Sequence, residues 1–71
     1  MRDEQELQKL RAAKCYYNWK GMLEDPENEL SMIEAYFLGF WTAFSVYQQI
    51  EFLSMCDRKD FCTLVNYDIW K

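Results

Sequence analysis

Apolar residues at helical spacing occupy two nearly opposite sides of the segment 30–53. A first seam steps by three and four residues through Leu30, Ile33, Phe37, Phe40, Phe44 and Tyr47. A second seam repeats this stepping at an offset of about 200° around the helix, through Met32, Tyr36, Gly39, Ala43, Val46, Ile50 and Leu53. A helix that is apolar on two sides has to be covered from two sides. The rest of so short a chain covers one seam well, so the pattern predicts that the other packs against a partner.

One long helix is predicted to carry both seams, from Pro26 to Met55. Asp25 before Pro26 is typical of a helix start, because an Asp side chain accepts backbone N–H groups and proline lacks one. A preceding helix of strong helix formers is predicted over residues 3–23, and Gly21 is expected to help end it. The short connection makes the two helices antiparallel neighbours. A helix of about 30 residues would extend about 45 Å, so we expect it to kink or to project toward a partner.

The third segment, residues 57–71, fits two patterns. Asp57 can cap a helix whose apolar stripe is Phe61, Leu64, Val65 and Ile69. The same region alternates as a strand would, at Thr63, Val65, Tyr67 and Ile69. We favour the helix, because a lone strand would have to pair with a second copy or with another protein. Whether this segment packs within its own chain or across a dimer stays open.

Glycine and proline are too rare for a small all-β fold, since the chain contains two glycines and one proline. A hydrophobic content of 51% with 18% aromatic residues is typical of a folded chain, and 71 residues fit a single domain covering 1–71. These observations predict an all-α fold. We expect a small helical bundle of two long antiparallel helices plus a short C-terminal helix, completed by dimerisation.

The cysteine pattern indicates a reducing compartment. Cys15, Cys56 and Cys62 are odd in number and form no CxxC pair, which favours free thiols packed as small apolar residues. A Cys56–Cys62 bridge or an intermolecular bridge is the alternative. The acidic start of the chain does not resemble a signal peptide, and the apolar stretch 35–47 is too short to span a membrane. We therefore expect a soluble cytoplasmic protein.

Charge is unevenly distributed along the chain. Twelve acidic and eight basic residues give a net charge of −4, yet no Lys or Arg occurs between Lys20 and Arg58. Direct nucleic-acid binding is not expected, because neutralising phosphates needs a concentrated basic face. The acidic stretch would attract a basic partner, or simply form a solvated surface that keeps the protein soluble.

The sequence contains no signature of catalysis or of a cofactor. Histidine is absent, which removes the commonest general base and the usual catalytic triads. Gly21 and Gly39 cannot form any glycine-rich phosphate loop or nucleophile elbow. Glu24 and Glu27 have the spacing of a carboxylate metal pair, but Asp25-Pro26 interrupts the helix between them. We expect no enzyme activity, no metal and no cofactor.

These features favour a small helical interaction protein that self-associates and binds, or inhibits, another protein. The second seam supplies the predicted self-association residues: Tyr36, Gly39, Ala43, Val46, Ile50 and Leu53. An aromatic and acidic helix surface supplies the predicted partner-binding residues: Leu38, Trp41, Glu27, Glu29 and Glu34. The alternative is an acidic nucleic-acid mimic that blocks a DNA- or RNA-handling protein, as some small phage proteins do. The identity of the partner does not follow from the sequence.

Overall fold

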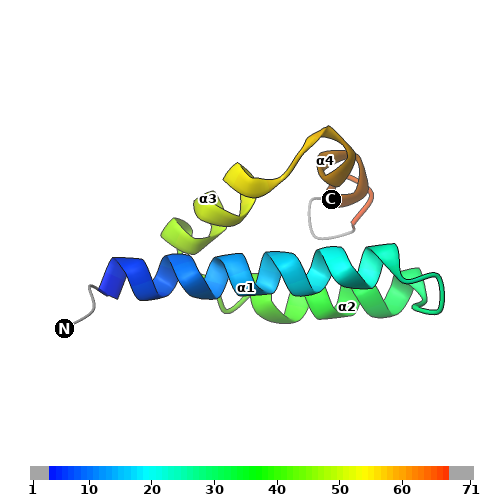
Figure 1. Ribbon diagram of the computed structural model, residues 1–71, viewed down its shortest axis with the longest axis horizontal. Helices are drawn as coiled ribbons and strands as arrows, with labels where there is room; N and C mark the ends of the chain where they lie inside the picture. The colour runs from blue at the N-terminus through cyan, green and yellow to red at the C-terminus, as the bar shows by residue number, and fades with distance from the viewer. Residues whose placement is uncertain (1–3, 68–71) are drawn as a thin grey trace.

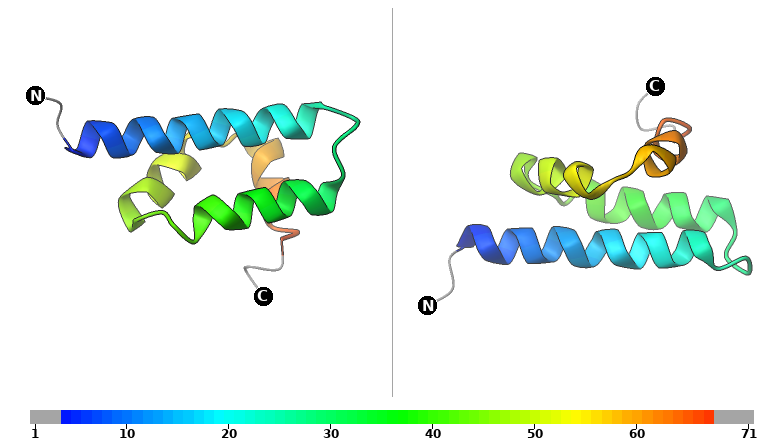
Figure 2. Two further views of the ribbon diagram at one scale, coloured as in Figure 1. Left: turned by 90° about the horizontal axis from the view of Figure 1, so that it is seen from below. Right: turned by 45° about the horizontal axis from the view of Figure 1, so that its top comes forward.

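The computed structural model describes residues 4–67 and is all-helical over that range, as predicted (Figure 1). Its elements in chain order are α1 (Glu4–Glu24), α2 (Leu30–Trp41), α3 (Val46–Met55) and α4 (Arg58–Leu64). Helices α1 and α2 run antiparallel side by side, while α3 and α4 both lie over the same side of that pair (Figures 1 and 2). The chain is thus a two-layer arrangement with its core between the layers.

The first connection differs in detail from the prediction. Gly21 lies inside α1 rather than at its end, and α1 continues to Glu24. The side chain of Asp25 accepts the backbone N–H of Glu27 at 3.0 Å, so it stabilises a turn instead of capping a helix at Pro26. Helix α2 consequently begins at Leu30, after the turn 25–29.

The prediction of one continuous helix from 26 to 55 is wrong, because the chain turns between Trp41 and Val46. Ser45 caps α3: its hydroxyl accepts the backbone N–H of Gln48, and the Gln48 side chain accepts the backbone N–H of Ser45. This reciprocal capping box satisfies two backbone donors that a new helix start would otherwise leave unpaired. Both apolar seams are therefore divided between α2 and α3, which cross instead of continuing one another (Figure 2).

The core between the two layers is almost entirely aromatic. Its largest fully buried side chains are Trp19 from α1, Phe37 from α2 and Phe52 from α3. Phe52 lies at its centre, with ring centroids 5.6 Å from Trp19 and 5.7 Å from Phe37. The other buried apolar residues are Ala12, Tyr16, Ile33, Trp41, Leu64 and Tyr67. Each large buried side chain contributes about 1.5–3 kcal/mol by leaving water, so this cluster is the main source of stability.

Residues 58–64 form a helix, which settles that part of the third segment against a strand. Asp57 caps α4 as predicted, in a second capping box with Asp60. Leu64 from the predicted stripe is buried, while Phe61 and Val65 are exposed. The remaining stripe residue, Ile69, lies outside the described residues.

Candidate functional site

A buried charged cluster fastens α4 to α1. Asp60 is 1% exposed and accepts the hydroxyl of Tyr16 at 2.7 Å. The ammonium of Lys20 forms an ion pair and hydrogen bond with Asp60, and lies 3.6 Å from the carboxylate of Asp57. The backbone N–H of Asp57 also donates to Asp60 at 3.2 Å. A buried carboxylate with this many hydrogen-bond donors is a candidate catalytic or binding group.

The electrostatics of this cluster indicate a structural role. Burial raises the pKa of Asp60, but the hydrogen bonds from Lys20 and Tyr16 outweigh it and hold that pKa below its ordinary value. Burial and the neighbouring Asp60 raise the pKa of Tyr16, and burial raises the pKa of Cys56 to about 12. The tyrosine and the thiol therefore stay protonated at neutral pH and are poor nucleophiles. Over residues 4–67, no buried side-chain nitrogen or oxygen lacks a hydrogen-bond partner.

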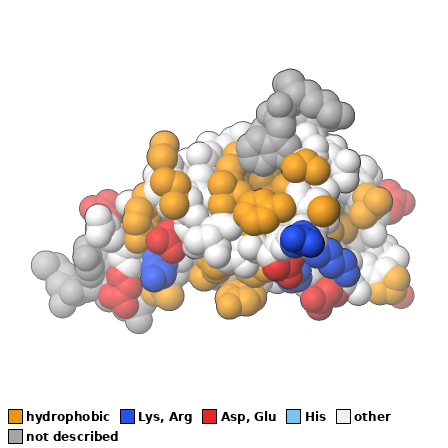
Figure 3. Space-filling model, turned by 90° about the horizontal axis from the view of Figure 1, so that it is seen from above, with side chains coloured by type: hydrophobic (Ala, Val, Ile, Leu, Met, Phe, Trp, Pro, Cys, Tyr) orange, Lys and Arg blue, Asp and Glu red, His pale blue; other side chains and the backbone are white. Residues whose placement is uncertain are grey.

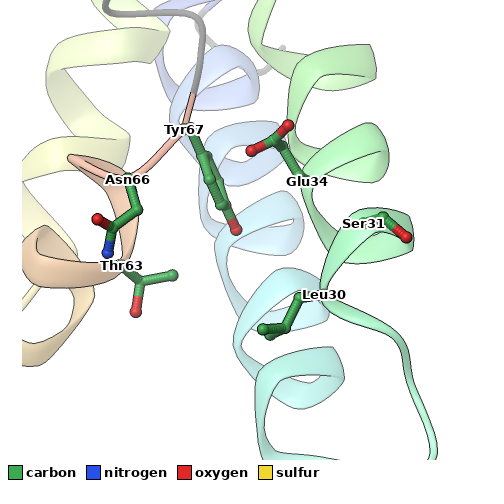
Figure 4. A pocket seen from close by; sticks show the side chains of 6 residues that line it. All are labelled: Leu30, Ser31, Glu34, Thr63, Asn66 and Tyr67. Atoms are coloured by element: carbon green, nitrogen blue, oxygen red, sulfur yellow. The ribbon is translucent and has the colours of Figure 1, made fainter.

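A pocket of about 450 Å³ lies between α2 and the end of α4 (Figure 4). It is lined by Leu30, Ser31, Glu34, Thr63, Asn66 and Tyr67. Glu34 extends from α2 toward Tyr67, whose hydroxyl accepts the indole N–H of Trp19 at 3.0 Å (Figure 4). The pocket thus combines the apolar Leu30 and the ring of Tyr67 with one carboxylate; Leu38, one helical turn after Glu34 on α2, is half-buried. Such a surface fits an apolar side chain next to a donor or a cation.

The side of α2 that points away from the core is exposed and uncharged. Met32 is 56% exposed and Tyr36 is 37% exposed. Ala35, Gly39 and Ala43 are exposed as well. We call these five residues the α2 outer face. A Cβ added at Gly39 would meet no atom within 4 Å, so the space above this glycine is open. Glu34 is the only charged residue between Leu30 and Ile50, and it lies on another side of the helix, in the pocket described above.

A second pocket, of about 320 Å³, lies where α1 passes the end of α2. It is lined by Arg11, Lys14, Cys15, Phe40, Ala43, Phe44 and Gln48, and we call it the basic pocket. Two cationic and two phenyl side chains line this pocket, and no acidic residue does. The α2 outer face reaches the basic pocket through Ala43, so the two are one continuous surface. Arg11 and Lys14 were not predicted from the sequence, although their i, i+3 spacing places them on one side of a helix.

The predicted self-association residues are spread over two sides of the molecule. Tyr36, Gly39 and Ala43 belong to the α2 outer face. Val46 and Ile50 are 71% and 60% exposed on α3, which lies in the other layer. Hydrophobic side chains are spread over that other side, and a group of basic and acidic side chains lies to the right of its middle (Figure 3). The remaining residue, Leu53, is half-buried and packs against the core.

The predicted partner-binding residues also divide. Glu27 and Glu29 are exposed in the turn 25–29, while Glu34 and Leu38 are half-buried. Trp41, on a flank between the two seams, was predicted either to cap an edge of the core or to anchor a partner; it is 7% exposed and stacks on Phe37 with ring centroids 5.1 Å apart. The reason is the turn after Trp41, which brings α3 and its Phe52 back over the indole. The core therefore encloses this tryptophan and leaves a partner little of it to contact.

Comparisons with protein-family models, with curated proteins and with solved structures found nothing that matches this chain. No helix within residues 4–67 is both long enough and apolar enough to cross a membrane. In the same part of the chain, no group of three or more Cys, Asp or Glu side chains could hold a metal ion.

Proposed function

We propose that this protein is a small helical interaction module that self-associates through the α2 outer face and binds, or inhibits, another protein. The observation that carries the proposal is the α2 outer face itself, which is exposed along the whole helix and contains no charge. Isolated exposed apolar residues are ordinary, whereas a contiguous apolar face is characteristic of an interaction surface. Burying it gains about 25 cal/mol for each Å² of apolar surface removed from water.

The small residues of this face support a helix as its occupant. Ala35 and Gly39 are four residues apart on one side of α2, and Ala43 follows in the turn 42–45, so a second helix backbone can approach α2 closely. Gly39 costs the helix about 1 kcal/mol relative to alanine. A Cβ at Gly39 would meet no atom of its own chain within 4 Å, so the folded monomer does not require a glycine there, and close approach of another chain is the reason that we propose.

The pocket beside α4 is the surface proposed for the other protein. It places Glu34 beside the apolar Leu30, and Leu38 follows Glu34 one helical turn later. This combination of a carboxylate and apolar groups suits a partner that presents an apolar side chain beside a lysine or an arginine. The acidic-mimic alternative would instead rely on the exposed carboxylates alone.

Self-association is tested by comparing Gly39→Leu with Gly39→Ala. Both replacements improve helix propensity and both fit the open space of the monomer, so they differ only in the bulk presented to a second chain. Light scattering over a dilution series should give twice the 8.7 kDa chain mass for the natural protein and for Gly39→Ala. At the same concentrations Gly39→Leu should be monomeric with an unchanged circular dichroism spectrum. A natural protein that is monomeric throughout, or a Gly39→Leu protein that remains dimeric, would refute this part of the proposal.

Binding of another protein is tested with a candidate recovered from host lysate and then purified. We expect Leu38→Asp to weaken its binding at least tenfold, with little change between low and high salt. A glutamine replacement at Glu51, away from the pocket, is the matched control. The nucleic-acid mimic predicts the reverse: binding that falls steeply with salt and is lost in Glu27→Gln/Glu29→Gln.

A further inference from the structure

We infer that the self-associating partner is a second copy in antiparallel orientation, with the acidic turn and Met32 of each copy seated on the basic pocket of the other. This inference rests on the proposed function and adds its geometry. The acidic turn is residues 25–29, which contain Asp25, Glu27 and Glu29 and connect α1 to α2 at one end of the pair (Figure 2).

The two surfaces are complementary in chemistry. The basic pocket is lined by the cations of Arg11 and Lys14 and by the rings of Phe40 and Phe44. The opposite end of the same surface offers exposed carboxylates in the acidic turn, followed by the exposed, flexible side chain of Met32. Carboxylates pair with the cations, and a methionine thioether packs favourably on aromatic rings. Each copy therefore carries the basic pocket at one end of this surface and the acidic turn with Met32 at the other.

The spacing of these ends fits a two-fold axis. Eleven residues of α2 and its following turn separate Met32 from Ala43 in the pocket, which is about 16 Å at the helical rise. The midpoint falls between Tyr36 and Gly39. A two-fold axis across the helices at that point places Met32 of one copy over Ala43 of the other, and both pockets are filled at once. Such an interface is self-complementary and closes at a dimer.

The same axis explains where the small residues lie. It sets α2 of one copy against α2 of the other, antiparallel, with Ala35 and Gly39 beside the axis where the two backbones come closest. The side chain of Asn18 donates to the hydroxyl of Tyr36 at 3.3 Å. This hydrogen bond holds the Tyr36 ring against α1, so the ring does not stand between the two α2 helices. A second copy is favoured over an unrelated anion because a single two-fold axis covers the α2 outer face, brings the small residues together and pairs the acidic turn with the basic pocket at both ends.

The decisive experiment is a pair of charge reversals tested separately and mixed. The pocket variant is Arg11→Glu/Lys14→Glu, and the turn variant is Glu27→Lys/Glu29→Lys; all four side chains are exposed. Each variant alone brings like charges together at both ends, and its dimer Kd should rise at least tenfold. An equimolar mixture restores opposite charges at both ends, so its heterodimer should form within about threefold of the natural Kd. Arg58→Glu/Lys59→Glu matches the net charge of the pocket variant away from this surface and should dimerise normally.

A second measurement uses the natural protein. A zero-length carbodiimide reagent, applied to a mixture of ¹⁵N-labelled and unlabelled protein, should join Lys14 to a carboxylate of the acidic turn. The joined peptides should carry mixed labels, because within one chain about ten residues of α1 separate Lys14 from the turn, which is about 15 Å.

The outcomes separate this inference from the proposed function. A dimer that ignores both charge reversals, or a mixture that fails to recover, overturns the antiparallel arrangement while leaving self-association intact. A natural protein that is monomeric in light scattering removes both. Joined peptides carrying only one label also contradict the arrangement.

Discussion

Replacing Asp60 with alanine is the most severe single change that the structure identifies outside the aromatic core. The carboxylate is 1% exposed, and its removal leaves the hydroxyl of Tyr16 without its acceptor and leaves Lys20 with only the carboxylate of Asp57, 3.6 Å away. An unsatisfied buried hydroxyl costs about 1–3 kcal/mol, and the lost charge-assisted hydrogen bond to Lys20 and the lost capping box of α4 add to that cost. A chain of this length has about 4–11 kcal/mol of stability in total, so Asp60→Ala should lose a large share of it.

Urea denaturation followed by tryptophan fluorescence measures this loss. The matched control is Asp57→Ala, which removes the other half of the same capping box from a side chain that is 63% exposed. A lost N-cap costs about 0.5–2 kcal/mol, so the two variants should differ by at least about 1 kcal/mol. Equal destabilisation by the two replacements would refute the reasoning, because it would mean that burial of Asp60 adds nothing to its role as a cap.

The same carboxylate predicts how stability depends on pH. The pKa of Asp60 is raised by burial but lowered further by its hydrogen bonds to Lys20 and Tyr16, so its folded-state pKa lies below the unfolded value. A lowered pKa favours the folded state above the unfolded pKa, and this contribution is lost as the pH falls through the folded pKa. The stability difference between the natural protein and Asp60→Asn should therefore be greatest near neutral pH and shrink in acid. A difference that grows in acid would show the opposite sign of shift.

Three further predictions concern the core, a cap and the thiols. Phe52→Ala should lower the free energy of unfolding in urea by about 3–5 kcal/mol, because this fully buried ring is the centre of the aromatic core. Ser45→Ala should cost about 0.5–2 kcal/mol by removing the capping box of α3, whereas Ser54→Ala inside α3 should cost less; thermal melts compare them. At about pH 8, iodoacetamide should alkylate exposed Cys62 well before Cys56, because burial raises the pKa of Cys56 to about 12. Peptide mass spectrometry after timed quenching gives the order, and equal rates would contradict it.

The helical character of the chain could be predicted because it depends on local sequence. Strong helix formers define α1, and Asp57 before α4 is a helix start that can be read directly. The turn at residues 42–45 was missed because the apolar stepping continues through it: Phe40 and Phe44 both stay against the core. The signal was present in Ser45 and Gln48, whose spacing is that of a capping box. Periodicity alone does not distinguish one long helix from two helices that bury the same seam.

The candidate site was harder to predict because it depends on how the helices cross. A straight helix would leave Trp41 on its flank, whereas the turn that follows folds α3 back and buries it under Phe52. The basic pocket unites Arg11 and Lys14 of α1 with Phe40 and Phe44, about thirty residues away, and no local pattern joins them. Gly39 was singled out correctly as lacking bulk, but only the structure shows that its own chain leaves it uncovered.

The completeness of the core bears on how folding and association are related. Trp19, Phe37 and Phe52 are fully buried within one chain, and the buried polar side chains of residues 4–67 all have partners. From the α2 outer face only Tyr36 reaches toward that core, through its contact with Phe40, so we expect a monomer to keep its fold. If the face associates as proposed, the dimer forms from folded chains, and dilution should separate it into monomers that keep their helicity. An obligate dimer would instead lose helicity and dimer mass together. Measuring helicity and mass along one dilution series therefore distinguishes a dimer that forms from folded monomers from a dimer whose chains fold only on association.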